Sequence, residues 1–187
     1  MAWKIFDDRE EQSLQNQESQ SSRDELLGQG LNMAQLKIGK YKVDSIQKDG
    51  KAWEELKFEG VEEVSSANLY EDFSKLYPRS TDKNSEMYIR NLLVRGDTIE
   101  VSFGGDETKL TERMGTTGAL LYAGELVFTL TEDPKINLVD FKLQKEGSHF
   151  GPGTRTRENF MDLWPTGLLE KHADQGNQEA KRILNYR

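Results

Sequence analysis

Residues 98–143 contain three patterned segments in succession: TIEVSF at 98–103, TTGALLYAGELVFTLT at 116–131 and INLVDFKL at 136–143. The first and last segments alternate apolar and polar residues, which is typical of strands, whereas the middle segment repeats apolar residues at helical spacing. Gly104-Gly105 ends the first segment, and Pro134 ends the helix. A strand, a helix and a second strand with short connections predict a βαβ unit, whose crossover we expect to be right-handed.

The predicted helix at 116–131 is apolar on almost every side. Leu120, Leu121 and Gly124 fall on one face, and Ala123 and Leu126 fall on the other. A helix with this pattern is buried on both sides, either by its own chain or by another subunit.

The residues before this unit favour two further strands and a short helix. Apolar and charged residues alternate over much of residues 36–58, and Asp49-Gly50 is a strong signal for a tight turn, so we expect a β-hairpin or the start of a β-meander there. Residues 66–77 show a helical pattern. A strand at 87–94 then turns at Arg95-Gly96-Asp97 into the segment at 98–103.

The two ends of the chain differ in character from its middle. In residues 7–25 only Leu14 is apolar, which predicts a flexible polar arm, and beyond Trp164-Pro165 one apolar stripe predicts a single terminal helix. The expected division is an arm at 1–30, an α/β core domain at 31–146, and a glycine-rich loop with a helical segment at 147–187.

The expected fold class is therefore α+β. It comprises a small mixed sheet with a βαβ unit, a hairpin-rich N-terminal part and a C-terminal amphipathic helix.

Composition excludes several functional classes. The 187 residues include no cysteine and only two histidines, so thiolate chemistry is excluded and a histidine-based metal site within one chain is disfavoured. The formal charge of -8 disfavours general nucleic-acid binding. No apolar run approaches the roughly 18 residues of a membrane span, and the first residues lack the apolar core of a signal peptide. As it stands, the sequence predicts a cytoplasmic protein that needs no cofactor.

No motif in the chain defines a catalytic site. Gly104-Gly105-Asp106-Glu107 resembles the signature of diguanylate cyclases, but an aromatic residue and an apolar strand do not follow it, so we predict a plain turn. Residues 147–157 are predicted to form a loop. Its first part, at 147–153, has three glycines without the Gly-Lys-Ser/Thr end of a phosphate-binding loop. Ser148 and His149 are neighbours whose side chains point apart in an extended loop, and no nucleophile elbow is present. We therefore expect a protein that is not an enzyme.

Two parts of the chain are candidates for binding a partner. An apolar cluster, Trp3, Ile5 and Phe6, precedes the polar arm, and the glycine-rich loop is flanked by aromatic and basic residues. The alternative interpretation is that the cluster packs on its own domain and that the glycine-rich segment is an ordinary mobile loop. The complete set of candidates is Trp3, Ile5, Phe6, His149, Phe150, Arg155, Arg157 and Trp164.

The segment from about residue 92 to residue 143 resembles the GerMN domain, which is named after a sporulation and germination protein of spore-forming bacteria. The resemblance rests on GDTIEVSF at 96–103, on TLTE at 129–132, which ends the helix, and on INLVDFKL at 136–143. It covers little over a quarter of the chain. It implies a non-enzymatic α/β module that binds or assembles in the cell envelope, and it assigns no catalytic residues.

The sequence thus leaves three functions open. The first is a protein–protein assembly module, in which the all-round apolar helix and the C-terminal stripe provide contacts and the chain associates with itself. The second is an accessory or inhibitor-type protein, for example one encoded by a phage, that holds a single partner. The third is an enzyme whose site is built from dispersed carboxylates. The location is cytoplasmic, or the cell envelope if the GerMN resemblance holds and a leader has been removed.

Overall fold

The structure is a computed structural model that describes residues 35–144, 146–147 and 150–187. The chain divides after Met33 into two units, and all of the described residues belong to the second one. The predicted arm with Trp3, Ile5 and Phe6, and also His149, lie outside the described residues.

The described part begins with a long β-hairpin. Strands β1 (Gln35–Lys48) and β2 (Lys51–Ser65) pair in antiparallel fashion through a two-residue turn at Asp49 and Gly50, whose φ angles are 51° and 77°. Positive φ at both turn residues matches the twist of paired strands, which is why Asp-Gly favours this turn. The predicted hairpin is confirmed, and β2 extends seven residues beyond the predicted limit at residue 58.

A second sheet holds four strands in the order β3-β4-β5-β6. Strands β3 (Met87–Arg95) and β4 (Thr98–Gly105) are antiparallel, β4 and β5 (Leu138–Lys142) are parallel, and β5 and β6 (Gly153–Arg155) are antiparallel. The sheet is therefore mixed, as expected. Strand β6 lies inside the segment predicted as a loop, because three residues pairing with β5 leave too little pattern to detect.

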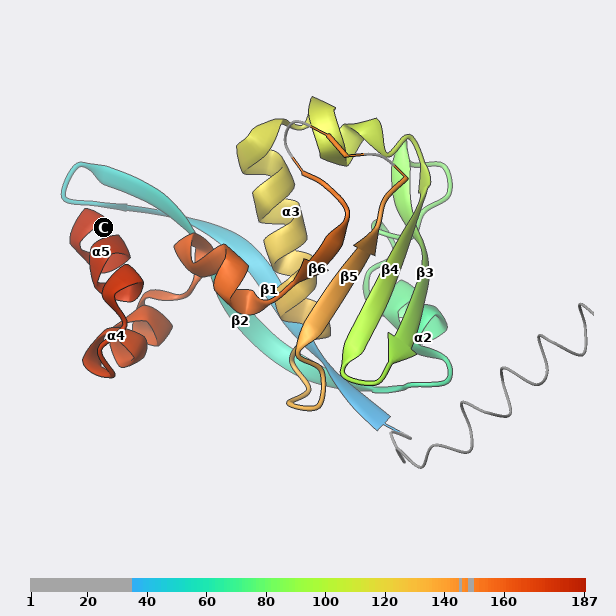
Figure 1. Cartoon of the computed structure of the whole chain (residues 1–187), viewed down its shortest axis with the longest axis horizontal. Coiled ribbons are helices and arrows are strands. Elements are labelled where there is room, and N and C mark those ends of the chain that lie inside the picture. Colours follow the sequence, from blue (N-terminus) through green and yellow to red (C-terminus); the bar gives the residue numbers. More distant parts are fainter. Residues whose placement is uncertain (1–34, 145, 148–149) are drawn as a thin grey trace, which may run out of the picture. The chain divides into compact units, whose positions relative to one another are not determined.

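Helix α3 (Gly115–Leu130) makes the crossover between the parallel strands β4 and β5, so the predicted βαβ unit is confirmed. A π-helical segment, η1 (Lys109–Arg113), precedes it. In Figure 1, α3 stands between the hairpin and the four-stranded sheet, and it contacts both β1 and β5. Ala119 and Phe128 lie on opposite faces of the helix and are both buried, so this chain itself covers two sides of the apolar helix. Leu120 is the exception, with 40% of its surface exposed.

Shorter helices close the remaining faces. Helix α2 (Leu69–Leu76) packs on β2 and β3 through the buried residues Leu69 and Phe73. Its observed start lies three residues after the predicted one.

The prediction of one terminal helix is wrong. After the 3-10 segment η2 (Arg157–Leu163), the chain forms two helices, α4 (Thr166–Asp174) and α5 (Gln178–Tyr186). Gly176 adopts a φ of 95°, which no helix interior allows, and the side chain of Asn177 caps α5 by accepting a hydrogen bond from the Ala180 amide. The apolar stripe continues because the two helices pack against each other. Taken together, these elements form a mixed α+β fold.

Candidate functional site

Two of the predicted binding residues pack against the sheet. The Phe150 side chain is 6% exposed and meets the Phe141 ring edge-on at 5.0 Å. The Arg155 guanidinium lies 5.0 Å from the centroid of the Phe150 ring and donates to the carbonyl oxygens of Gly151 and Thr154. Phe150 therefore anchors the glycine-rich loop, while Arg155 is left with carbonyl partners and, in the described part of the chain, no carboxylate.

Arg157 links the end of helix α3 to η2. Its guanidinium donates to the Phe128 carbonyl oxygen at 3.0 Å, to Thr131 Oγ1 at 2.9 Å and to Glu132 Oε2 at 2.8 Å. Glu132 also accepts from the Tyr41 hydroxyl at 2.7 Å. A cation at a helix C-terminus satisfies carbonyl groups that have no intrahelical partner. These contacts use the donors of Arg157 inside the fold.

Trp164 belongs to the core. Its side chain is 3% exposed, its Nε1 donates to the Arg157 carbonyl oxygen at 2.9 Å, and its ring meets that of His172 at 4.7 Å. In this structure Trp164 is not accessible to a partner.

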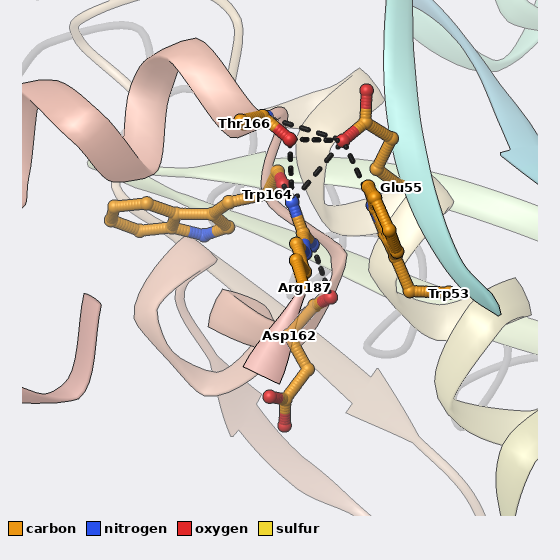
Figure 2. A network of polar contacts seen from close by, with 6 residues as sticks. All are labelled: Trp53, Glu55, Asp162, Trp164, Thr166 and Arg187. Carbon is orange, nitrogen blue, oxygen red and sulfur yellow. Dashed lines mark hydrogen bonds and ion pairs between the residues drawn. The ribbon is translucent and has the colours of Figure 1, made fainter. Parts of the chain in front are cut away.

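A polar network joins the hairpin to the C-terminal helices (Figure 2). Glu55 Oε2 on β2 accepts from the amide and from the hydroxyl of Thr166, the first residue of α4, at 3.2 and 2.8 Å. A carboxylate from another element thus caps the start of this helix. Negative charge at a helix N-terminus is favourable because the free amides there carry partial positive charge.

Arg187 completes the network. Its guanidinium donates to Glu55 Oε2 at 3.2 Å and to the carbonyl oxygens of Asp162 and Trp164, both at 2.8 Å, and it lies 5.6 Å from the centroid of the Trp53 ring. The Arg187 side chain is 4% exposed and that of Glu55 is 20% exposed. Since these groups are bonded to one another, the network is a structural junction rather than a binding site.

One accessible feature of the described residues is a groove between α3 and η2, with Leu120 at its centre. One hollow beside Leu120 measures about 170 Å³ and is bordered by Glu54, Leu121 and Asp162. A second hollow measures about 290 Å³ and is bordered by Leu120 and Arg155. Both hollows share Asn159 and Phe160 as walls. We call this surface the α3–η2 groove.

The two ends of the α3–η2 groove carry opposite charge. Arg155 borders one hollow, and Glu54 and Asp162 border the other. The side chain of Asp162 is 79% exposed and has only a distant ion-pair partner, Arg182, at 3.7 Å. The groove is thus apolar in its middle, positive at one end and negative at the other.

Two of the predicted binding residues with described positions line this groove. They are Arg155, whose guanidinium has no carboxylate partner in the described part of the chain, and the buried residue Phe150. Sequence reasoning missed Glu54, Leu120 and Asp162 as site residues. The all-round apolar pattern of 116–131 was the only available signal, and it does not tell which turn of the helix stays uncovered.

The Gly-Gly-Asp-Glu segment is not the plain turn that we predicted, because Gly104 and Gly105 are the last residues of β4 and pair with β3, and only Asp106 and Glu107 lead from the strand towards η1. Asp106 accepts from the amide and hydroxyl of Thr108 and pairs with Arg113, and Glu107 accepts from the Gln144 amide at 2.7 Å. Among the described residues there is no group of three or more histidine, aspartate or glutamate side chains that could hold a metal ion.

The fold and the groove define a mixed α+β protein with an exposed, polarised apolar surface. Comparison with family models, with curated proteins and with solved structures gives no match to this chain. Within the described residues, no helix is both long enough and apolar enough to cross a membrane.

Proposed function

We propose that this protein is a non-catalytic assembly module and that two copies pair through the α3–η2 groove. The observation that carries the proposal is the exposure of Leu120, on a helix with no other exposed large apolar residue, between two hollows of opposite charge. Exposed apolar groups beside concave surfaces are typical of protein–protein contacts.

The groove is complementary to itself under a two-fold rotation. A two-fold contact brings the same patch of both copies together in opposite directions. With the axis near Leu120, the Arg155 end of one copy faces the Glu54 and Asp162 end of the other. Leu120 of each copy then enters a hollow of its partner.

The association that this geometry supports is weak. Burying the rest of one Leu120 side chain contributes about 1 kcal/mol, and each exposed charge pair contributes about 0.2–1 kcal/mol. Because association also costs translational and rotational freedom, we expect a dissociation constant on the order of 1 mM or weaker. The fraction of paired copies would therefore depend on the local concentration of the protein.

Solution mass by light scattering over a wide concentration range tests the proposal. Leu120→Lys places a charge at the centre of the interface, so we expect it to weaken association by about tenfold or more. Leu93→Lys is the matched control, because Leu93 is 39% exposed but lies on β3, away from α3. The same series on a chain lacking residues 1–25 shows whether association depends on those residues.

A strictly monomeric protein would overturn this proposal. The result would favour the second hypothesis, a protein that holds one different partner through the Trp3, Ile5 and Phe6 cluster or through the loop from His149 to Arg157. If Leu93→Lys abolishes association and Leu120→Lys does not, the interface lies at the edge strand β3.

The GerMN resemblance of residues 92–143 stays a prediction, and it supports the same class of function because it implies a module that binds or assembles. It would place the protein in the cell envelope, whereas the sequence as it stands places it in the cytoplasm.

A further inference from the structure

A cavity of about 130 Å³ opens between α2 and α3. It is lined by two tyrosines, one glutamate, two hydroxyl-bearing residues and two apolar residues: Tyr77, Tyr122, Glu125, Ser80, Thr129, Phe73 and Leu126. Tyr77 is held in place, since its ring stacks on Phe73 at 4.7 Å and its hydroxyl donates to the Gly39 carbonyl oxygen at 2.7 Å. The cavity is therefore partly preformed.

Glu125 has no partner in the described part of the chain. Neither a hydrogen bond nor an ion pair reaches its carboxylate, and burial alone raises its pKa. Burial and the nearby charge of Glu125 also raise the pKa of Tyr122. A carboxylate that is partly buried without compensation is unfavourable in its charged form. Other groups of this kind in the chain, such as Glu132 and Glu55, are paired.

We propose that this cavity binds a guanidinium group. A planar cation meets the faces of aromatic rings favourably, and its N–H groups match a carboxylate flanked by hydroxyl acceptors. The volume is close to that of cavities of roughly 150 Å³ that take a benzene-sized group, so it admits a guanidinium with one or two methylene groups. An ammonium ion is compact and strongly hydrated, and it uses the ring faces and the several acceptors less well.

This site is independent of the α3–η2 groove. Residues of a helix are about 100° apart around its axis, so Tyr122, Glu125 and Thr129 face away from Leu120. The net charge of -8 favours a cationic ligand at long range. The ligand is either the side chain of an arginine in a protein or a free small guanidine compound, which present the same chemical group.

Titration of the full chain with methylguanidinium chloride, followed by NMR, tests the proposal. We expect saturable shifts of signals from Tyr77, Ser80 and Tyr122, with a dissociation constant on the order of 1 mM, as for other fragments of this size. Sodium chloride at equal ionic strength controls for salt. Tetramethylammonium controls for a cation without N–H groups, and we expect it to bind at least about fivefold more weakly.

Glu125→Gln removes the charge but keeps the shape of the side chain, and we expect it to weaken binding by about tenfold or more. Glu71→Gln is the matched control, because it removes one charge from the exposed side of α2 and should change binding by less than about twofold. The spectrum of each unliganded variant reports its fold.

The source of the guanidinium is separated by comparing argininamide with a short arginine-containing peptide. Tighter binding of the peptide assigns the site to a protein partner, and equal binding assigns it to the small molecule. Three results would overturn the proposal: no saturable shift, unchanged binding in Glu125→Gln, or equal binding of tetramethylammonium.

Discussion

Arg187 holds together three segments that are far apart in the sequence. Its guanidinium bonds to Glu55 on β2, to the end of η2 and to Thr166 at the start of α4. Without the guanidinium, the Glu55 carboxylate stays partly buried but has fewer hydrogen-bond donors. Removing one partner of a buried ion pair is costly, because the charge of the other partner is left uncompensated.

Arg187→Ala is expected to lower the free energy of unfolding by about 2 kcal/mol, measured by urea denaturation. Arg182→Ala is the control, because Arg182 is 62% exposed and pairs with Glu179 on the surface, and it should cost less than about 0.5 kcal/mol. Equal effects of the two substitutions would contradict the role given to the junction.

Helix α3 begins with two glycines that differ in conformation. Gly115 has a φ of 73°, whereas Gly118 is helical, and a methyl group at Gly118 would meet only Met114 at ordinary contact distance. Alanine favours the helix interior, but it is strained at positive φ.

We therefore expect Gly118→Ala to raise the free energy of unfolding by about 0.5–1 kcal/mol and Gly115→Ala to lower it by about 1 kcal/mol. Urea denaturation of both variants checks the pair. Opposite signs support the assigned start of α3, and a destabilising Gly118→Ala would show that this turn is more tightly packed than the structure indicates.

The sequence predicted those elements whose signals lie within a few neighbouring residues. Asp49-Gly50 fixed the hairpin turn, and the change from alternating to helical spacing after Gly105 identified the βαβ unit. The single terminal helix that we predicted includes Gly176, because the spacing of apolar residues does not reveal that one glycine has a positive φ angle. Strand β6 escaped prediction because it exists only through pairing with β5.

The junction and the groove were beyond prediction for a different reason. Glu55 meets Thr166 and Arg187 across 111 and 132 positions of sequence, and nothing near any of these residues marks the meeting. Arg157 and Trp164 were singled out for their chemistry, which the fold uses internally. Chemical type alone does not separate a residue that binds a partner from one that binds its own chain.

At the scale of the whole molecule, the proposed two-fold contact predicts a result that a contact between two different surfaces of the protein does not predict. Arg155→Asp and Asp162→Arg each place like charges opposite one another in a pair of identical copies, so each variant alone should associate about tenfold more weakly. In a mixture of the two variants, positions 155 and 162 again carry opposite charges where they face each other across the contact. Light scattering of the mixture should therefore show association restored to about the original level, and a mixture as weak as its components would exclude the two-fold arrangement.

The position of the tryptophans gives the junction an optical signature. Of the three in the chain, Trp53 and Trp164 lie on either side of Arg187 in Figure 2, whereas the rings of the four-stranded sheet and of α3 are phenylalanine and tyrosine. Fluorescence from these two indoles therefore reports when the C-terminal helices leave the hairpin. It is nearly blind to the βαβ unit, whose unfolding has to be followed through tyrosine or through the backbone.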